Sequence, residues 1–91
     1  IVEDYEDARE FMKFLLETYG YQVIEAADGI EAIDRVKHQL PDLVLMDISL
    51  PVVDGLMATR TIREFKPNTK LPIIAVTAFG KNYYKKAIEA G

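Results

Sequence analysis

Apolar side chains follow two different spacings along the chain, and these spacings predict alternating strands and helices. Residues 1–2, 22–26, 43–46 and 73–76 form short segments rich in valine, isoleucine and leucine, which is typical of strands. Between them, apolar residues recur every three or four positions, which is typical of helices with one buried face. The order strand then helix, repeated four times, predicts an α/β fold: a doubly wound parallel sheet with helices on both faces.

Glycine and proline residues set the bounds of the four predicted helices, which cover residues 5–19, 30–40, 55–65 and 79 or 80 to 90. The first helix is predicted to have one inward stripe, formed by Ala8, Phe11, Met12, Leu15, Leu16 and Tyr19. The inward residues predicted for the second helix are Ile30, Ile33, Val36 and Leu40. Those predicted for the third are Leu56, Thr59 and Ile62.

Composition and charge exclude several classes of protein. The 91 residues include no cysteine, which excludes disulfides and thiolate metal sites, and no apolar run of the ~18 residues that a membrane-spanning helix needs. The net charge is −4, with thirteen acids and four bases in residues 1–54 against two acids and seven bases in residues 55–91. These later bases are scattered and no DNA-reading motif accompanies them, so we expect no direct nucleic-acid binding. A cytoplasmic protein without membrane contact is the expectation.

Residues capable of chemistry stand where three of the four strands end. Glu3-Asp4 ends the first strand, Asp47 the third and Thr77 the fourth. Ligands of doubly wound sheets bind outside the carboxyl ends of the strands, so these side chains are predicted to converge. Converging carboxylates repel one another, and a cation offsets that repulsion. Oxygen ligands without histidine or cysteine favour a hard ion such as Mg²⁺.

Asp47 is the best candidate for a nucleophile, because it ends the most central-looking strand. A carboxylate can accept a phosphoryl group, and the Thr77 hydroxyl could donate to a phosphoryl oxygen. Structural roles compete with this interpretation. Thr77 and the Glu3-Asp4 pair could instead cap the helices that follow them, and Asp28, Asp42 and Asp54 are interpreted as cap or turn residues.

Four stretches of the sequence resemble bacterial response-regulator receiver domains. They are IVED at residues 1–4, YQVIEAADG at 21–29, LVLMDISLPVVDG at 43–55 and PIIAVTA at 72–78. Each stretch alone is weak, whereas the combination is specific and the resemblance covers all 91 residues. It implies a flavodoxin-like fold with strand order 2-1-3-4-5 and a phosphoacceptor in a two-component phosphorelay.

The resemblance also implies a role for each matching residue. Asp47 matches the phosphoacceptor and is also expected to bind the metal ion, and Glu3 and Asp4 match the acidic pair that holds Mg²⁺ or Mn²⁺. Ser49 matches the position whose backbone carbonyl binds the same ion. Thr77 matches the switch hydroxyl, and Ala78 a small residue that leaves room for the phosphoryl group. The implied partner is a histidine kinase or a histidine phosphotransfer protein, and a homodimer is left open. Such a domain catalyses only its own phosphorylation and dephosphorylation.

The sequence departs from the family pattern at its end. It stops at Gly91, before a fifth strand that carries a lysine and before a fifth helix, so we expect residues 1–91 to be an incomplete receiver domain with four strands. The shortened sheet is expected to expose an apolar edge at Ile73, Ile74 and Val76. The missing lysine keeps one alternative open, a receiver-like binding module that is no longer phosphorylated. A phosphohydrolase is disfavoured, because its second catalytic aspartate would stand where Ser49 is.

Overall fold

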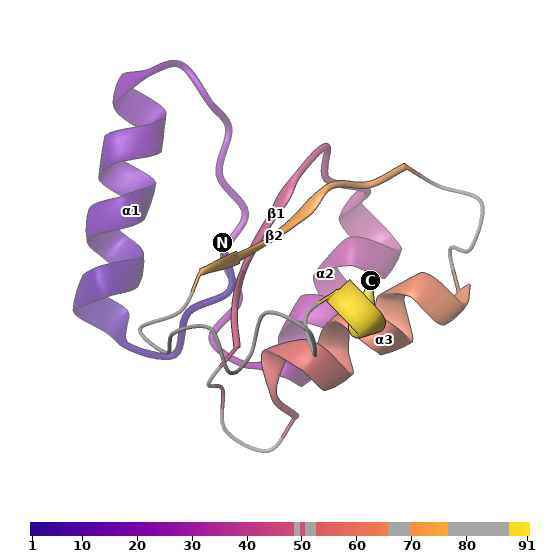
Figure 1. Ribbon diagram of the computed structural model, residues 1–91. Coiled ribbons are helices and arrows are strands. Elements are labelled where there is room, and N and C mark those ends of the chain that lie inside the picture. Colours follow the sequence, from indigo (N-terminus) through magenta and orange to yellow (C-terminus); the bar gives the residue numbers. More distant parts are fainter. Residues whose placement is uncertain (49, 51–52, 66–69, 77–87) are drawn as a thin grey trace.

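A computed structural model describes residues 1–48, 50, 53–65, 70–76 and 88–91. Along the chain its helices and strands (Figure 1) are α1 Glu6–Thr18, α2 Gly29–Gln39, β1 Val44–Asp47, α3 Gly55–Phe65 and β2 Ile73–Val76, with no full strand between α1 and α2. The predictions for α3 and β2 have the observed bounds, and those for α1, α2 and β1 are correct to within one residue at each end. Most of the predicted fourth helix lies outside the described residues, which include only its end at 88–90. None of the described helices is long and apolar enough to cross a membrane.

The sheet is parallel and has the predicted order. β1 and β2 pair in register, with Asp47 opposite Val76, and Val2 forms parallel bridges to Met46 on one side and Ala26 on the other. The spatial order is therefore the segment at Ala26, the segment at Val2, β1 and β2. Among the described residues this is the 2-1-3-4 part of the flavodoxin-like order.

Two of the predicted strands are reduced to single bridges. Residues 1–2 and 22–26 pair only through Val2 and Ala26 and are not full strands. The Ala26 amide donates to the Ile1 carbonyl at 2.9 Å, and the terminal amine of Ile1 donates to the Ile24 carbonyl at 2.8 Å. The sequence predicted the end of a strand at 1–2 and a short strand at 22–26, and both segments lie in the sheet at the predicted places, each through one bridge residue.

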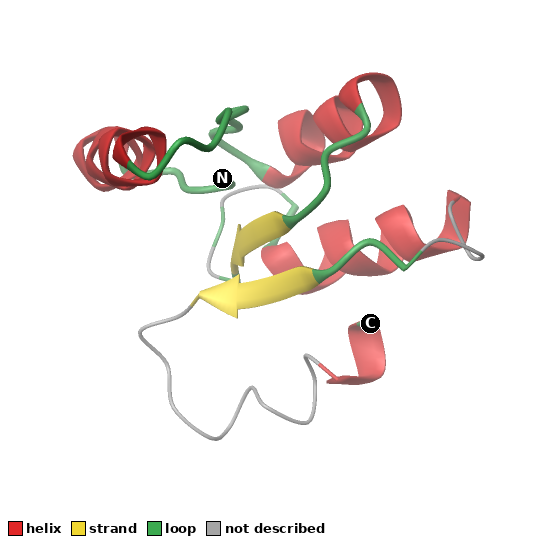
Figure 2. Ribbon diagram, turned by 90° about the horizontal axis from the view of Figure 1, so that it is seen from above, coloured by secondary structure: helices red, strands yellow, loops and turns green. Residues whose placement is uncertain are grey.

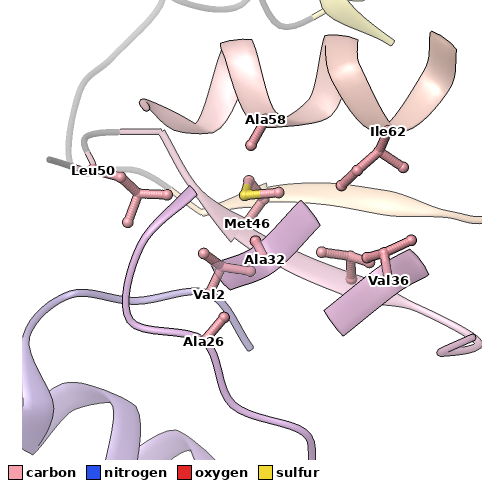
Figure 3. Packing of buried hydrophobic residues seen from close by; sticks show 9 residues of the cluster. Val2, Ala26, Ala32, Val36, Met46, Leu50, Ala58 and Ile62 are labelled. Atoms are coloured by element: carbon pink, nitrogen blue, oxygen red, sulfur yellow. The ribbon is translucent and has the colours of Figure 1, made fainter. Parts of the chain in front are cut away.

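Helices α2 and α3 cover one face of the sheet, and among the described helices only α1 lies on the other (Figures 1 and 2). The core lies between β1 and the α2–α3 pair, where Met46 and Ile62 are the largest fully buried side chains (Figure 3). The cluster consists of Val2, Ala26, Ala32, Val36, Val44, Met46, Leu50, Ala58 and Ile62. Burial of this apolar surface is the main force that holds the α2–α3 layer on the sheet.

The inward face of α2 differs from the prediction. Ala32 and Val36 are buried there, and Ile33 is partly buried. Ile30 and Leu40, both predicted to face inward, are 56% and 66% exposed. Leu40 does not continue the helix, because it is the C-cap residue with a left-handed φ of 47°. In α3, Thr59 and Ile62 are buried as predicted, and Leu56 is only partly buried.

Helix α1 gives the clearest disagreement with the predicted burial. None of its residues is buried, and Phe11 and Leu15, from the predicted inward stripe, are 66% and 44% exposed. In the described part of the chain no helix besides α1 lies on this side of the sheet, where Ile74 and Val76 of β2 are also exposed. The expected exposed edge is confirmed for these two residues, whereas Ile73 packs against the core.

Candidate metal centre

The three acidic residues predicted to converge do so at the carboxyl ends of two neighbouring segments. The Val2 amide donates to the Leu45 carbonyl at 2.8 Å, and the Asp47 amide donates to the Val2 carbonyl at 3.0 Å. This ladder places Asp47, the last residue of β1, beside Glu3. Carboxylate oxygens of Glu3, Asp4 and Asp47 all lie within 4.8 Å of one another.

The pKa of Glu3 is raised by its surroundings in this cluster. Burial, a hydrogen bond with Asp47 and the negative charges of Asp47 and Asp4 together raise the pKa of Glu3 from 4.5 to about 7, against a smaller lowering by the Tyr5 backbone. Each of the three causes penalises the ionised carboxylate. Glu3 therefore holds its proton in mildly acidic solution and releases it near neutrality.

The donor set suits a hard divalent cation. It consists of carboxylate oxygens, with no histidine or cysteine, and its members differ in exposure: Asp4 is exposed, whereas Glu3 and Asp47 are partly buried. Mg²⁺ is usually bound by one or two carboxylates and retains several waters. Because Asp4 is exposed beside two partly buried carboxylates, an ion bound here can also hold several waters. The residues present therefore fit Mg²⁺.

Three predicted site residues lie outside the described part of the chain: Ser49, Thr77 and Ala78. The described residue that precedes Thr77 is Val76, which pairs in register with Asp47. The structure thus brings together Glu3, Asp4 and Asp47, while the roles of the other three stay predictions. Asp28 and Asp54 are helix caps, as interpreted from the sequence, because they accept from the amides of Glu31 and Met57, each at 2.8 Å.

Sequence reasoning missed two residues that shape the site. Gly55 packs so closely on Asp47 that a Cβ there would collide with the Asp47 carbonyl and lie 2.7 Å from the Ile48 Cα, so only glycine fits. The Asp54-Gly55 dipeptide is a turn signal that could have drawn attention to it. Arg9 donates from Nη1 to the Glu3 carbonyl at 2.9 Å. No motif in the sequence marks Arg9 as a site residue, although it lies only six residues after Glu3.

The sequence profile of the response regulator receiver domain matches residues 1–91. The chain belongs to this family. One relative is the polar-differentiation response regulator DivK of Brucella ovis, which is 40% identical over 91 residues, covering all of this chain and 74% of that protein. The receiver domain of this chain is a signalling module of two-component response regulators, which interact with histidine kinases and phosphotransfer proteins.

Solved receiver domains share its fold. Vibrio cholerae chemotaxis protein CheY4 superposes with a TM-score of 0.92 at 25% identity, covering 99% of this chain and 76% of that one. The receiver domain of the sensor histidine kinase PA1611 from Pseudomonas aeruginosa superposes with a TM-score of 0.89 at 38% identity, covering 99% and 75%. That receiver domain has a magnesium ion coordinated in its active-site cleft. Receiver domains bind Mg²⁺ at such an acidic site, which agrees with the donor set found here.

Proposed function

We propose that Asp47 accepts a phosphoryl group from a phosphohistidine, while Glu3 and Asp4 hold the Mg²⁺ ion that the reaction needs. The convergence of the three carboxylates within 4.8 Å at the strand ends is the observation that carries this proposal. Asp47 is the member of the trio that ends β1 and is partly buried, and Gly55 packs directly on its carbonyl. A fixed backbone is what a weak nucleophile requires, because phosphoryl transfer depends on positioning and charge neutralisation.

In the proposed step, a carboxylate oxygen of Asp47 forms a bond to phosphorus as the bond from phosphorus to the donor imidazole nitrogen breaks. The electron pair of that bond stays with the imidazole, and the product is an aspartyl phosphate. The bound cation neutralises charge on the phosphoryl oxygens. Attack of water on phosphorus later releases inorganic phosphate and regenerates the Asp47 carboxylate. Both reactions belong to the domain itself, and we assign it no other catalytic activity.

The remaining site residues complete this proposal. We assign to Ser49 a backbone carbonyl ligand for the cation, to Thr77 the hydroxyl that senses the phosphoryl group, and to Ala78 the small side chain that leaves it room. Mn²⁺ is proposed to substitute for Mg²⁺, since it is a hard divalent ion that suits the same oxygen donors. Because Glu3 retains a proton up to about pH 7, the affinity for either ion should rise as the pH passes that value.

The proposed partner is a histidine kinase or a histidine phosphotransfer protein. Borrelia burgdorferi CheY, which superposes with a TM-score of 0.87 at 31% identity over 99% of this chain and 69% of that one, was solved in complex with CheX, BeF₃ and magnesium. We propose no direct nucleic-acid or membrane partner for this domain and a cytoplasmic location. A homodimer stays a prediction.

Intact mass after treatment with acetyl phosphate and Mg²⁺ tests the assignment of Asp47. We expect one added phosphoryl group, lost in Asp47→Asn and without the cation. Asp42→Asn is the matched control, because it makes the same chemical change at an exposed residue just before the opposite end of β1. Uptake by Asp47→Asn would refute the assignment. Cation binding without uptake by the folded wild-type chain would instead support a binding module that is no longer phosphorylated.

A further inference from the structure

We propose that Arg9 is a positioning residue for the cation site, which it serves by fixing the backbone of the Glu3-Asp4 turn. This inference rests on the proposed function, because it assigns Glu3 and Asp4 to the cation. Arg9 touches neither the phosphoryl group nor the ion in this arrangement. Its effect passes through the peptide group of Glu3, whose orientation decides where the two acidic side chains point.

The Arg9 side chain bridges the acidic turn and the edge of the sheet. It is only 16% exposed, its Nη1 donates to the Glu3 carbonyl at 2.9 Å, and its Nε lies 3.4 Å from Glu25 Oε1. A planar guanidinium carries donors that point in several fixed directions, so it can hold both acceptors at once. A lysine in the same place has one ammonium, which cannot reproduce that fork.

Glu25 is itself held firmly, which makes it an anchor for Arg9. Its Oε2 accepts from Lys13 Nζ at 3.3 Å, and its carbonyl accepts from Arg35 Nε at 3.3 Å. The next residue, Ala26, accepts from the Glu3 amide at 3.0 Å. The amide of Glu3 is thus fixed by the backbone at Ala26, and its carbonyl is fixed by Arg9.

The acidic turn needs such a tether because its two carboxylates repel each other and that of Asp47, and local structure gives it little support. Asp4 and Tyr5 form bends between the bridge at Val2 and the start of α1. Tyr5 is the N-cap residue of α1 and makes no side-chain hydrogen bond to the helix amides. Without the Arg9 contact, repulsion is free to turn Glu3 and Asp4 away from Asp47, and the cation would then have to gather its ligands at a cost in affinity.

Isothermal titration of Mg²⁺ into the chain at pH 8, above the pKa of Glu3, tests this role. We expect Arg9→Gln to weaken Mg²⁺ binding about tenfold, the lower end of the loss that accompanies removal of a group that orients metal ligands. Arg9→Lys should weaken it less, by roughly threefold, because it keeps the charge and only one of the two contacts. Lys13→Gln is the matched control, since it removes the same charge from the same helix and the same Glu25 partner without touching Glu3. We expect its affinity to stay within about twofold of wild type.

A second measurement distinguishes a role in positioning the metal ligands from a general loss of structure. Phosphorylation by acetyl phosphate should need a higher Mg²⁺ concentration in Arg9→Gln for half its maximal rate, while the rate at saturating Mg²⁺ stays within about twofold of wild type. Equal losses of affinity in Arg9→Gln and Lys13→Gln would overturn the inference, since charge alone would then explain both. A lower maximal rate with an unchanged Mg²⁺ requirement would also overturn it.

Circular dichroism identifies variants that fail to fold. If Arg9→Gln does not fold, Arg9→Lys decides the question: weaker binding than in Lys13→Gln supports the role, and equal binding overturns it. Failure of this inference differs visibly from failure of the proposed function. In the first case wild type binds Mg²⁺ and the Arg9 variants bind it equally well. In the second, folded wild type takes up no phosphoryl group, and if it also binds no Mg²⁺ both ideas fall.

Discussion

The two faces of the sheet are held to their helices by different forces. On one face, α2 and α3 bury a continuous apolar cluster around Met46 and Ile62 (Figure 3). On the other, α1 buries no residue, and its tie to the rest of the chain includes ion pairs from Arg9 and Lys13 to Glu25. Apolar burial is strong and insensitive to salt, whereas partly exposed ion pairs contribute little and are screened. The first face therefore supplies most of the stability, and the second positions the acidic turn.

Truncation of one large side chain on each face should expose this difference most clearly. Met46→Ala removes a side chain that is 1% exposed and should lower the free energy of unfolding by about 3 kcal/mol. Phe14→Ala removes a larger side chain that is 72% exposed on α1 and should change it by less than about 0.5 kcal/mol. Urea unfolding of both variants measures the contrast. Similar losses would mean that the α1 face is covered in solution.

The cluster of Glu3, Asp4 and Asp47 lies where the two faces of the sheet meet. The dependence of stability on pH should show how this cluster contributes. The pKa of Glu3 is raised to about 7 in the folded chain, so between about pH 4.5 and 7 the folded state holds a proton that the unfolded state has lost. The stability contributed by Glu3 is therefore present at low pH and is lost as pH rises through 7. We expect a loss of roughly 1–2 kcal/mol in the metal-free chain after solvent screening is allowed for.

Asp47→Asn should flatten this dependence, because it removes a neighbouring charge that raises the pKa of Glu3. Burial is the largest cause, so part of the slope should remain. Urea unfolding in a chelating buffer from pH 4.5 to 8 measures the effect, with Asp42→Asn as the control for loss of one exposed carboxylate. The interpretation fails if the wild-type and Asp47→Asn profiles run parallel.

The smallest expected contrast concerns the helix caps. Asp28 Oδ1 accepts from the Glu31 amide at 2.8 Å and caps α2, whereas Tyr5, at the start of α1, makes no such bond. Asp28→Ala should therefore cost about 1 kcal/mol, and Tyr5→Ala should have almost no effect on stability. Asp28→Asn should retain most of the cap. Thermal unfolding resolves the three variants, and an equal loss in Asp28→Ala and Tyr5→Ala would contradict the cap assignment.

The sequence by itself predicted the bounds of most elements and the convergence of the three acidic residues. The bounds of α3 and β2 followed from local apolar spacing and from turn residues, and the caps at Asp28 and Asp54 from their type and place. Convergence of Glu3, Asp4 and Asp47 followed from a general rule, that the carboxyl ends of parallel strands share one rim. Each of these inferences needs only near neighbours in the chain or a property of every parallel sheet.

Only the tertiary structure decided which faces are buried and what holds the acidic turn. An apolar stripe on a helix predicts that this face can be buried, but it does not show that another element packs against it. Phe11 and Ile30 are exposed although their spacing predicted burial. The ion pair of Arg9 with Glu25 joins two different elements, and the contact of Arg9 with Glu3 and the close approach of Gly55 to Asp47 depend on how the chain turns between them. Such contacts depend on the relative placement of whole elements, which packing sets and local sequence does not encode.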